Sequence, residues 1–150
     1  YIKFFHKTNN FTSIIFRVTN VYGGQPSVNR VNGIIDKLIL NPDITITSNI
    51  KETINFIHMN DLIDLLLRAI YIEMNGYNLF LVGGSSSISI QGLLEKIQKY
   101  VTPNITYKND EATPSYINID TTKVQKYFNW ECQYSIDSGI IKQVKSLKSL

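Results

Sequence analysis

The run Ser13-Ile14-Ile15-Phe16-Arg17-Val18 carries the strongest signal for the architecture of this chain. Its continuous apolar character and its β-branched residues are typical of a strand that is buried in a parallel sheet. Gly23-Gly24-Gln25-Pro26 follows this run and ends regular structure there. A second run of the same kind, Tyr77-Asn78-Leu79-Phe80-Leu81-Val82, ends at Gly83-Gly84. Apolar residues at helical spacing lie between the two runs. Strands that alternate with helices predict an α/β architecture.

The rest of the chain continues this alternation. Helices are predicted over residues 1–7, 31–39, 62–70, 93–101, 124–128 and 136–147, and further strands over 43–47, 54–58 and 105–108. We expect Asn60 or Asp61 to cap the helix that follows it, and Ser89 to cap the next one. The helix over 62–70 has so wide an apolar face that it should be buried on more than one side.

Composition excludes several classes of protein. The 150 residues suit one domain, and 43% hydrophobic with 18% charged residues excludes a disordered chain, collagen or a coiled coil. The net charge is +3, and without any run of Lys or Arg it gives no argument for nucleic-acid binding. The single cysteine, Cys132, excludes an internal disulfide and favours a reducing, cytoplasmic location.

The sequence contains neither a predicted membrane span nor a signal peptide. Its best apolar stretch, residues 62–72, carries Asp64 and Arg68 and is too short to cross a bilayer. The chain begins at Tyr1, inside a predicted helix, so we expect it to be a fragment.

Several segments, taken in order, resemble one protein family. They are Phe16-Arg17-Val18-Thr19-Asn20-Val21-Tyr22-Gly23, then Asn55-Phe56-Ile57-His58-Met59-Asn60-Asp61-Leu62, then Tyr77 to Gly84, and finally Asp120-Thr121-Thr122-Lys123 followed by Phe128-Asn129-Trp130. This order resembles the C-terminal part of the extended short-chain dehydrogenases/reductases, the NAD-dependent epimerase/dehydratase family that acts on nucleotide sugars. The similarity covers nearly the whole chain.

The resemblance implies a fold made of the last strands and helices of a Rossmann-like sheet plus a small α/β substrate-binding lobe. Residues 1–23 and about 54–82 would be Rossmann-side elements, and residues 24–53 and 83–150 would form the lobe. The family binds NAD or NADP mainly through an N-terminal glycine-rich loop, and an intact relative would be a homodimer.

The sequence lacks the two parts that perform the family's chemistry. Neither glycine pair, Gly23-Gly24 or Gly83-Gly84, has the spacing G-x-G-x-x-G. The family's Tyr-x-x-x-Lys pair is also missing, since Tyr1 is followed four residues later by Phe5. We therefore assign no catalytic residue to this chain and expect it to be inactive by itself.

The resemblance places one group of binding residues around the first strand. Asn20 matches the family asparagine between cofactor and sugar diphosphate, where an amide donates to a phosphate oxygen; a turn asparagine is the alternative. Val18 and Val21 match positions at the nicotinamide end of the cofactor. Val28 and Arg30 precede the helix behind the diphosphate, and Arg30 is either a phosphate ligand or a solvated side chain.

A second group lies further along the chain. The resemblance places the nucleotide base against the strand that carries Thr45 and Thr47, largely through backbone hydrogen bonds. Many family members hold the diphosphate with an arginine where this chain has Ile54. A second basic residue is common about ten residues before the position of Asp120, where this chain has Asn109-Asp110-Glu111; Lys108 lies close by and is the candidate ligand. Without a guanidinium group at either of these two positions, the chain should bind a pyrophosphate more weakly.

The remaining polar residues have structural explanations. His58 fits a structural position at a strand end better than a catalytic base. Asp61 and Asp64, spaced i, i+3, have no histidine or third carboxylate to complete a metal site, and Cys132 has no basic neighbour in the sequence that would activate it.

The sequence thus predicts the nucleotide-sugar-binding, C-terminal portion of an NAD-dependent epimerase/dehydratase-like enzyme, with a nucleotide sugar as its partner. The alternative is a non-catalytic binding module or a pseudoenzyme remnant of the same fold.

Overall fold

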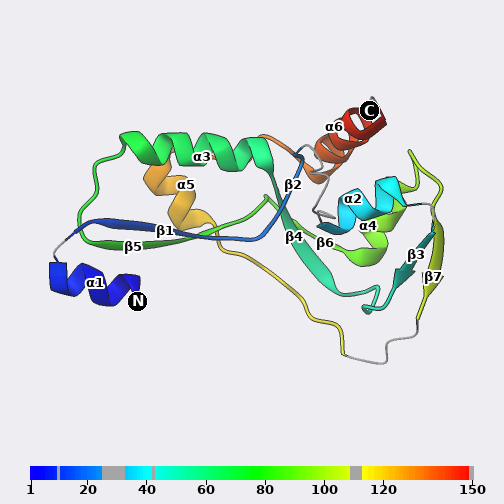
Figure 1. Ribbon diagram of the computed structural model, residues 1–150, viewed down its shortest axis with the longest axis horizontal. Coiled ribbons are helices and arrows are strands. Elements are labelled where there is room, and N and C mark those ends of the chain that lie inside the picture. Colours follow the sequence, from blue (N-terminus) through cyan, green and yellow to red (C-terminus); the bar gives the residue numbers. More distant parts are fainter. Residues whose placement is uncertain (10, 25–32, 42, 109–112, 149–150) are drawn as a thin grey trace.

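The computed structural model describes residues 1–9, 11–24, 33–41, 43–108 and 113–148. The molecule is elongated, with two groups of elements at its ends joined through β2, β4 and β6 (Figure 1). In chain order the elements are α1 (Ile2–Asn9), β1 (Ser13–Val18), β2 (Asn20–Tyr22), α2 (Gly33–Leu40), β3 (Asp43–Ile46), β4 (Thr53–His58), α3 (Met59–Tyr71), β5 (Tyr77–Val82), β6 (Ser87–Ser89), α4 (Ile90–Ile97), β7 (Asn104–Tyr107), α5 (Thr122–Phe128) and α6 (Ile136–Lys148).

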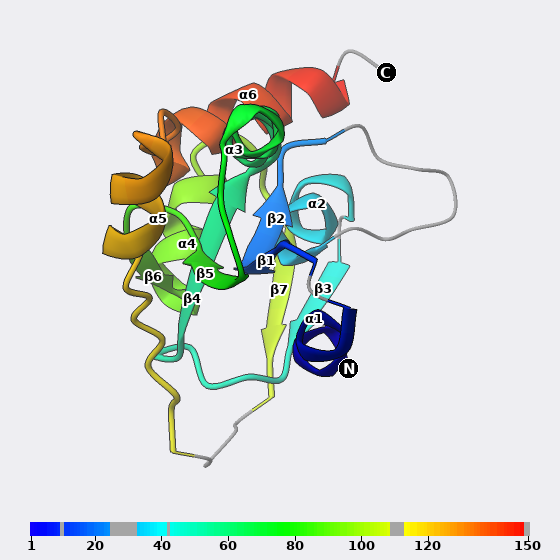
Figure 2. The same ribbon diagram turned by 90° about the vertical axis from the view of Figure 1, so that its left-hand side faces the viewer.

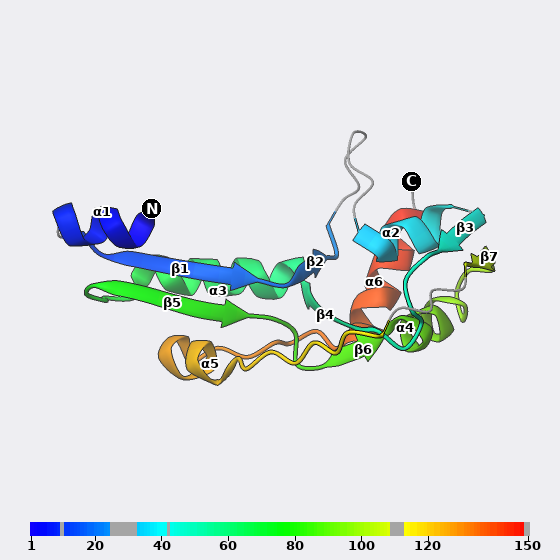
Figure 3. The same cartoon turned by 90° about the horizontal axis from the view of Figure 1, so that it is seen from below.

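The two apolar runs form a parallel pair of strands, β1 and β5. Ser13 lies opposite Tyr77 and Val18 opposite Val82, so the runs pair along their whole length. Helix α3 covers one face of this pair, while α1 lies on the β1 side and α5 on the β5 side (Figures 2 and 3). A parallel pair with helical connections is the arrangement that the sequence predicted.

The chain changes sheets directly after β1. The Thr19 amide still donates to the Val82 carbonyl, at 2.9 Å, and β2 then pairs in parallel with β4 instead. Strand β4 also pairs in antiparallel fashion with β6, so β2, β4 and β6 make a three-stranded sheet between the two ends of the molecule. The short strands β2 and β6 were not predicted as separate elements.

The other end of the molecule is a small α/β lobe. Strands β3 and β7 pair in parallel, and helices α2, α4 and α6 pack on one another beside them (Figure 1). Eleven buried residues form the core of this lobe, which we call the lobe cluster: Tyr22, Ile35, Leu38, Ile46, Phe56, Ile90, Leu93, Leu94, Ile97, Ile140 and Val144.

A second core lies at the β1–β5 end of the molecule. We call it the strand cluster, and it consists of Ile57, Leu65, Phe80, Val82, Val124, Phe128 and Trp130. Val124, Phe128 and Trp130 lie in α5 or just after it, in the range 83–150 that was expected to form the substrate-binding lobe. They pack with β5 and α3 instead. Neighbouring residues Phe56 and Ile57 of β4 point into different clusters, because successive side chains of a strand face opposite sides.

The caps of two helices test the sequence predictions. Ser89 caps α4 as predicted, because its hydroxyl accepts a hydrogen bond from the Gly92 amide at 3.0 Å. The prediction for α3 was wrong: His58 is its N-cap, and its Nδ1 accepts from the Asn60 amide at 3.2 Å. The sequence prediction considered the usual capping residues, whereas here the imidazole takes that part.

Helix α3 is covered on one side only. Leu65 is buried, but Leu67 and Ile70 on its outer side are 52% and 71% exposed. The prediction of burial on more than one side is therefore not met within the described residues. Nor is any described helix long and apolar enough to cross a membrane.

The outer edge of β5 is occupied by one side chain of α5. The Lys123 ammonium donates to the Leu79 carbonyl at 2.7 Å and lies 4.6 Å from the centre of the Phe80 ring. A lysine in this position blocks an edge at which another strand would otherwise add.

Candidate functional site

Asn20 stands where the chain leaves β1 for β2, at the carboxyl end of the β1–β5 pair. Its side chain is exposed, and its amide nitrogen donates to the Asn55 backbone carbonyl at 3.2 Å. Ligands of α/β proteins bind at the carboxyl ends of parallel strands, so this position suits the predicted contact with a substrate. The bond to Asn55 gives the Asn20 side chain a defined orientation.

The side chain of Asn55 fixes this crossing point, and sequence reasoning missed it. Its Oδ1 accepts from the Gly84 amide at 2.8 Å and from the Thr19 hydroxyl at 3.0 Å. Its Nδ2 donates to the Gly84 carbonyl at 3.2 Å and to the Ser87 hydroxyl at 3.4 Å. This buried amide thus has partners for both of its polar atoms, and it ties the β1–β2 crossing to the β5–β6 turn. The signal that could have found Asn55 is an asparagine inside an otherwise apolar predicted strand.

A cavity of about 280 Å³ lies between α2 and the strand β3. Its polar lining residues are Thr45, Thr47, Ser48 and Lys37. Its other lining residues are apolar: Ile34, Leu38, Ile44, Ile46 and Ile90. Apolar walls with a few polar groups are typical of a site for a small organic molecule.

The structure brings together some of the predicted site residues. Thr45 and Thr47 both line the cavity, and the Lys108 amide donates to the Ile46 carbonyl at 2.9 Å, which places Lys108 at the neighbouring strand end. Asn20 does not line the cavity; it belongs to β2, which contacts the same helix α2.

The other predicted positions are distributed differently. Val18 ends β1 and is partly exposed, whereas Val21 is half-buried against the strand cluster. Ile54 packs against the lobe cluster. Val28 and Arg30 lie outside the described residues.

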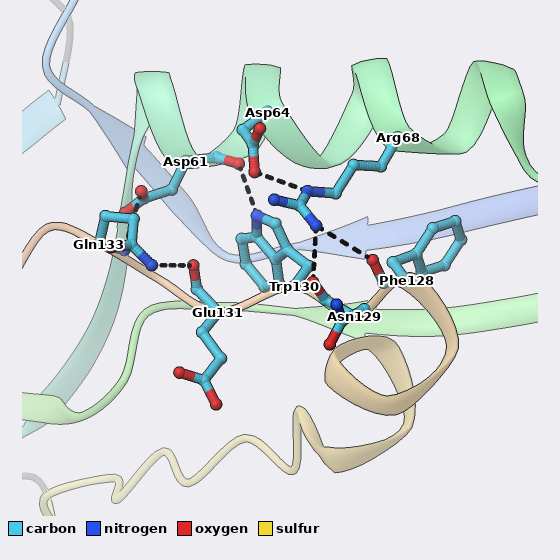
Figure 4. A network of polar contacts seen from close by, with 8 residues as sticks. All are labelled: Asp61, Asp64, Arg68, Phe128, Asn129, Trp130, Glu131 and Gln133. Atoms are coloured by element: carbon cyan, nitrogen blue, oxygen red, sulfur yellow. Dashed lines mark hydrogen bonds and ion pairs between the residues drawn. The ribbon is translucent and has the colours of Figure 1, made fainter.

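A polar network joins α3 to the segment after α5 (Figure 4). The Asp61 carboxylate accepts from the backbone amides of Gln133 and Tyr134, at 3.0 and 3.1 Å, and the Asp61 carbonyl accepts from the Trp130 indole at 3.2 Å. The Arg68 guanidinium binds the Asn129 carbonyl at 2.6 Å.

This network explains two residues that were weighed as metal ligands. Asp61 fastens the 133–134 backbone and is not the cap of its helix. Asp64 pairs with Arg68 at 2.9 Å on the exposed surface. Among the described residues no three His, Cys, Asp or Glu side chains come together in a way that would hold a metal ion.

Cys132 has the environment of a structural thiol. Its Sγ donates to the Gly83 carbonyl at 3.3 Å, and burial raises the pKa of the thiol to about 12. At neutral pH it is therefore protonated, and only the thiolate is an effective nucleophile.

Known proteins of similar sequence or structure share one fold. The chain is 24% identical over 156 residues to the dTDP-4-dehydro-6-deoxyglucose reductase of Escherichia coli, and the match covers 99% of this chain and 49% of that protein. No protein-family profile matches the chain.

Two solved structures illustrate the similarity in three dimensions. The UDP-glucose 4-epimerase of Thermotoga maritima, solved with UDP-glucose, superimposes with a TM-score of 0.82 at 16% identity, over 99% of this chain and 50% of the epimerase. The dTDP-glucose 4,6-dehydratase of Bacillus anthracis, in complex with NAD, gives 0.82 at 18% identity, over 97% of this chain and 47% of the dehydratase.

In each case the chain spans about half the length of the protein it matches, and the matched parts are the C-terminal halves. The resemblance predicted from the sequence is therefore confirmed: this chain has the fold of the C-terminal part of the extended short-chain dehydrogenases/reductases, as in the NAD-dependent epimerases and dehydratases.

Proposed function

We propose that this chain is the nucleotide-sugar-binding portion of an NAD-dependent epimerase/dehydratase-like enzyme. The observation that carries the proposal is the cavity between α2 and β3, whose lining includes both threonines of the strand that the resemblance assigns to the base. Proteins of the same fold have been solved with UDP-glucose and with NAD, which supports this assignment.

In this proposal the cavity holds the nucleobase. The apolar side chains of Ile34 and Leu38 on α2 contact the ring, and the β3 residues Thr45 and Thr47 offer hydroxyl and backbone groups to its polar edge. Lys37, at the rim of the same cavity, favours the negative charge of a nucleotide.

The diphosphate and sugar are proposed to lie toward Asn20. One hydrogen of the Asn20 amide is held by the Asn55 carbonyl, so its second hydrogen and its oxygen remain for a ligand. Arg30, Val28 and Lys108 stay proposed contributors. The resemblance implies an arginine at the position of Ile54, whose apolar side chain packs against the lobe cluster, so we expect the diphosphate to be held weakly.

The cofactor would contact only the margin of this chain. NAD, or NADP, supplies hydride acceptance in such enzymes, and Val18 offers an apolar surface at the carboxyl end of β1 that suits the nicotinamide end. Val21 is a proposed contact through its backbone, because its side chain packs inward. No described residue is assigned a proton-transfer step.

We further propose that the protein acts in the cytoplasm, which the free thiol of Cys132 supports, and that the intact enzyme is a homodimer. The exposed apolar side chains of α1 and α3 favour burial against additional polypeptide.

Titration calorimetry with UDP tests the binding proposal. We expect the change Thr45→Tyr, which fills the cavity, to weaken UDP binding at least tenfold. The control is Thr106→Tyr: Thr106 pairs with Thr45 across the strands but does not line the cavity, so this variant should bind as the parent does. Equal weakening by both variants, or no binding of UDP by the parent chain at millimolar concentration, would contradict the proposal.

A further inference from the structure

His58 is a buried titratable residue with an unusual hydrogen-bonding state. It is 1% exposed. Its Nδ1 accepts from the Asn60 amide, at 3.2 Å, while its Nε2 is buried and has no partner among the described residues. Since an accepting Nδ1 carries no proton, the hydrogen bond requires the neutral imidazole with its proton on Nε2. An orphaned buried group of this kind requires an explanation.

Three elements meet at this imidazole. The Tyr134 ring, in the segment before α6, stacks on it with ring centres 4.0 Å apart and planes inclined by 14°. The Tyr22 ring at the end of β2 meets it edge-on at 5.2 Å. Gly23 has a φ of +90°, and a β-carbon added there would overlap the imidazole, so only glycine allows this close approach. His58 thus joins the end of β2, the start of α3 and the segment before α6.

The charged groups around His58 act in opposite directions. Lys142 of α6 lies close by, since its ammonium donates to the Tyr134 hydroxyl at 2.8 Å, and its positive charge disfavours a second cation. Asp61 of α3 favours one. Burial is the largest cause of the lowered pKa of His58, followed by Lys142. Two tyrosines also face the ring: burial raises the pKa of Tyr22, and the hydrogen bond from Lys142 lowers the pKa of Tyr134.

We propose that His58 is an acid-sensitive latch, which reinforces the junction of the end of β2, the first turn of α3 and the segment before α6, beside the bonds of Asp61, only while its imidazole is neutral. This inference does not depend on the proposed function. Protonation turns Nδ1 into a donor that faces the Asn60 N–H, so the cap of α3 is lost. It also places a cation beside Lys142 in a site without a described acceptor for Nε2.

The latch sits next to the candidate substrate site. Strand β2 begins with Asn20 and ends with Tyr22, directly before Gly23. Opening at His58 therefore releases the far end of the strand that positions Asn20. We expect the junction to be ordered at neutral pH and to loosen as the imidazole is protonated.

Hydrogen exchange followed by mass spectrometry tests the latch on the whole chain at low micromolar concentration. Exchange at the imidazole C2 position reports the titration of each histidine, and the chain has only two, His6 and His58. We expect His58 to titrate below the usual value of about 6.5. Amide protection of the peptide that contains Asn60, corrected for the intrinsic pH effect, should fall at least tenfold across that titration.

Two variants provide controls. His58→Asn keeps a side-chain acceptor for the Asn60 amide but does not titrate, so its protection should be independent of pH in this range. His6→Asn should behave like the parent chain. If His58 titrates at or above 6.5, or if Asn60 protection in the parent does not follow that titration, the latch is refuted. These two results come from the parent chain, so they stand even if His58→Asn fails to fold.

Discussion

Replacing Asp61 by asparagine tests whether the backbone of residues 133–134 is held by a buried carboxylate. The Asp61 side chain is 3% exposed and accepts two backbone N–H groups. An asparagine of the same shape has only one oxygen to offer. Its NH₂ group would face the second N–H, which leaves one buried donor without a partner.

The expected cost follows from these two bonds. A hydrogen bond to a charged group contributes about 1.5–3 kcal/mol, and a neutral one about 1 kcal/mol. Asparagine loses one charged bond and weakens the other, and it also loses the favourable position of a carboxylate in the first turn of α3. Relief of the buried charge offsets part of this loss. We expect Asp61→Asn to lower the free energy of unfolding by about 2–3 kcal/mol.

The chain carries its own probe for this measurement. Trp130 is its single tryptophan, is 2% exposed and binds the Asp61 carbonyl, so urea unfolding can be followed by its emission. Asp64→Asn is the matched control one turn away on the same helix: its exposed pair with Arg68 contributes about 0.3–0.5 kcal/mol. A loss below about 1 kcal/mol for Asp61→Asn, or equal losses for both variants, would refute the assignment.

Three further predictions concern other parts of the molecule. Gly84→Ala should lower the free energy of unfolding by about 2 kcal/mol or more in the same urea assay, because a β-carbon there would overlap the Phe56 carbonyl. The control is Gly24→Ala, whose β-carbon would meet only the Met59 side chain at 3.6 Å. It should change the free energy of unfolding by less than about 1 kcal/mol. Burial raises the pKa of the Asp36 carboxyl in the folded chain. Ionisation of this carboxyl therefore destabilises the fold as the pH rises from its pKa in the unfolded chain to its pKa in the folded chain. Asp36→Asn should unfold at a higher urea concentration than the parent at pH 7, and this difference should disappear on acidification toward pH 3. The isolated chain should associate through its exposed apolar surface, and the double change Leu67→Glu with Ile70→Glu should reduce light scattering at equal concentration; a parent chain that remains monomeric would contradict this.

The parallel pair at the centre of the fold was predictable, because the two apolar runs carry the signal of buried strands without help from the rest of the chain. The change of sheet at Thr19 was not predictable from periodicity. It depends on hydrogen bonds from Asn55 to residues that lie 29 to 36 positions away in the sequence. Strands β2 and β6 are only three residues long, too short for a pattern.

The candidate site, like the fold, could be predicted from the sequence only in part. Thr45 and Thr47 were named from the family resemblance of their strand, and both line one cavity. The cap of α3 was misassigned because local preference favoured Asn60 or Asp61, whereas tertiary contacts decided the outcome. Asp61 is drawn to the amides of residues 133 and 134, and the imidazole of His58 is stacked under Tyr134, where it reaches the Asn60 amide.

The lysine on the outer edge of β5 makes the two edges of the β1–β5 pair differ in how readily another strand could add to them. Because Lys123 already donates to the Leu79 carbonyl, a further strand on that side would have to displace it. Strand β1 has no second neighbour among the described strands, and its pairing with β5 is parallel. Polypeptide that extends this sheet therefore meets no such side chain to displace at β1 within the described residues, so the β1 edge is the more open of the two.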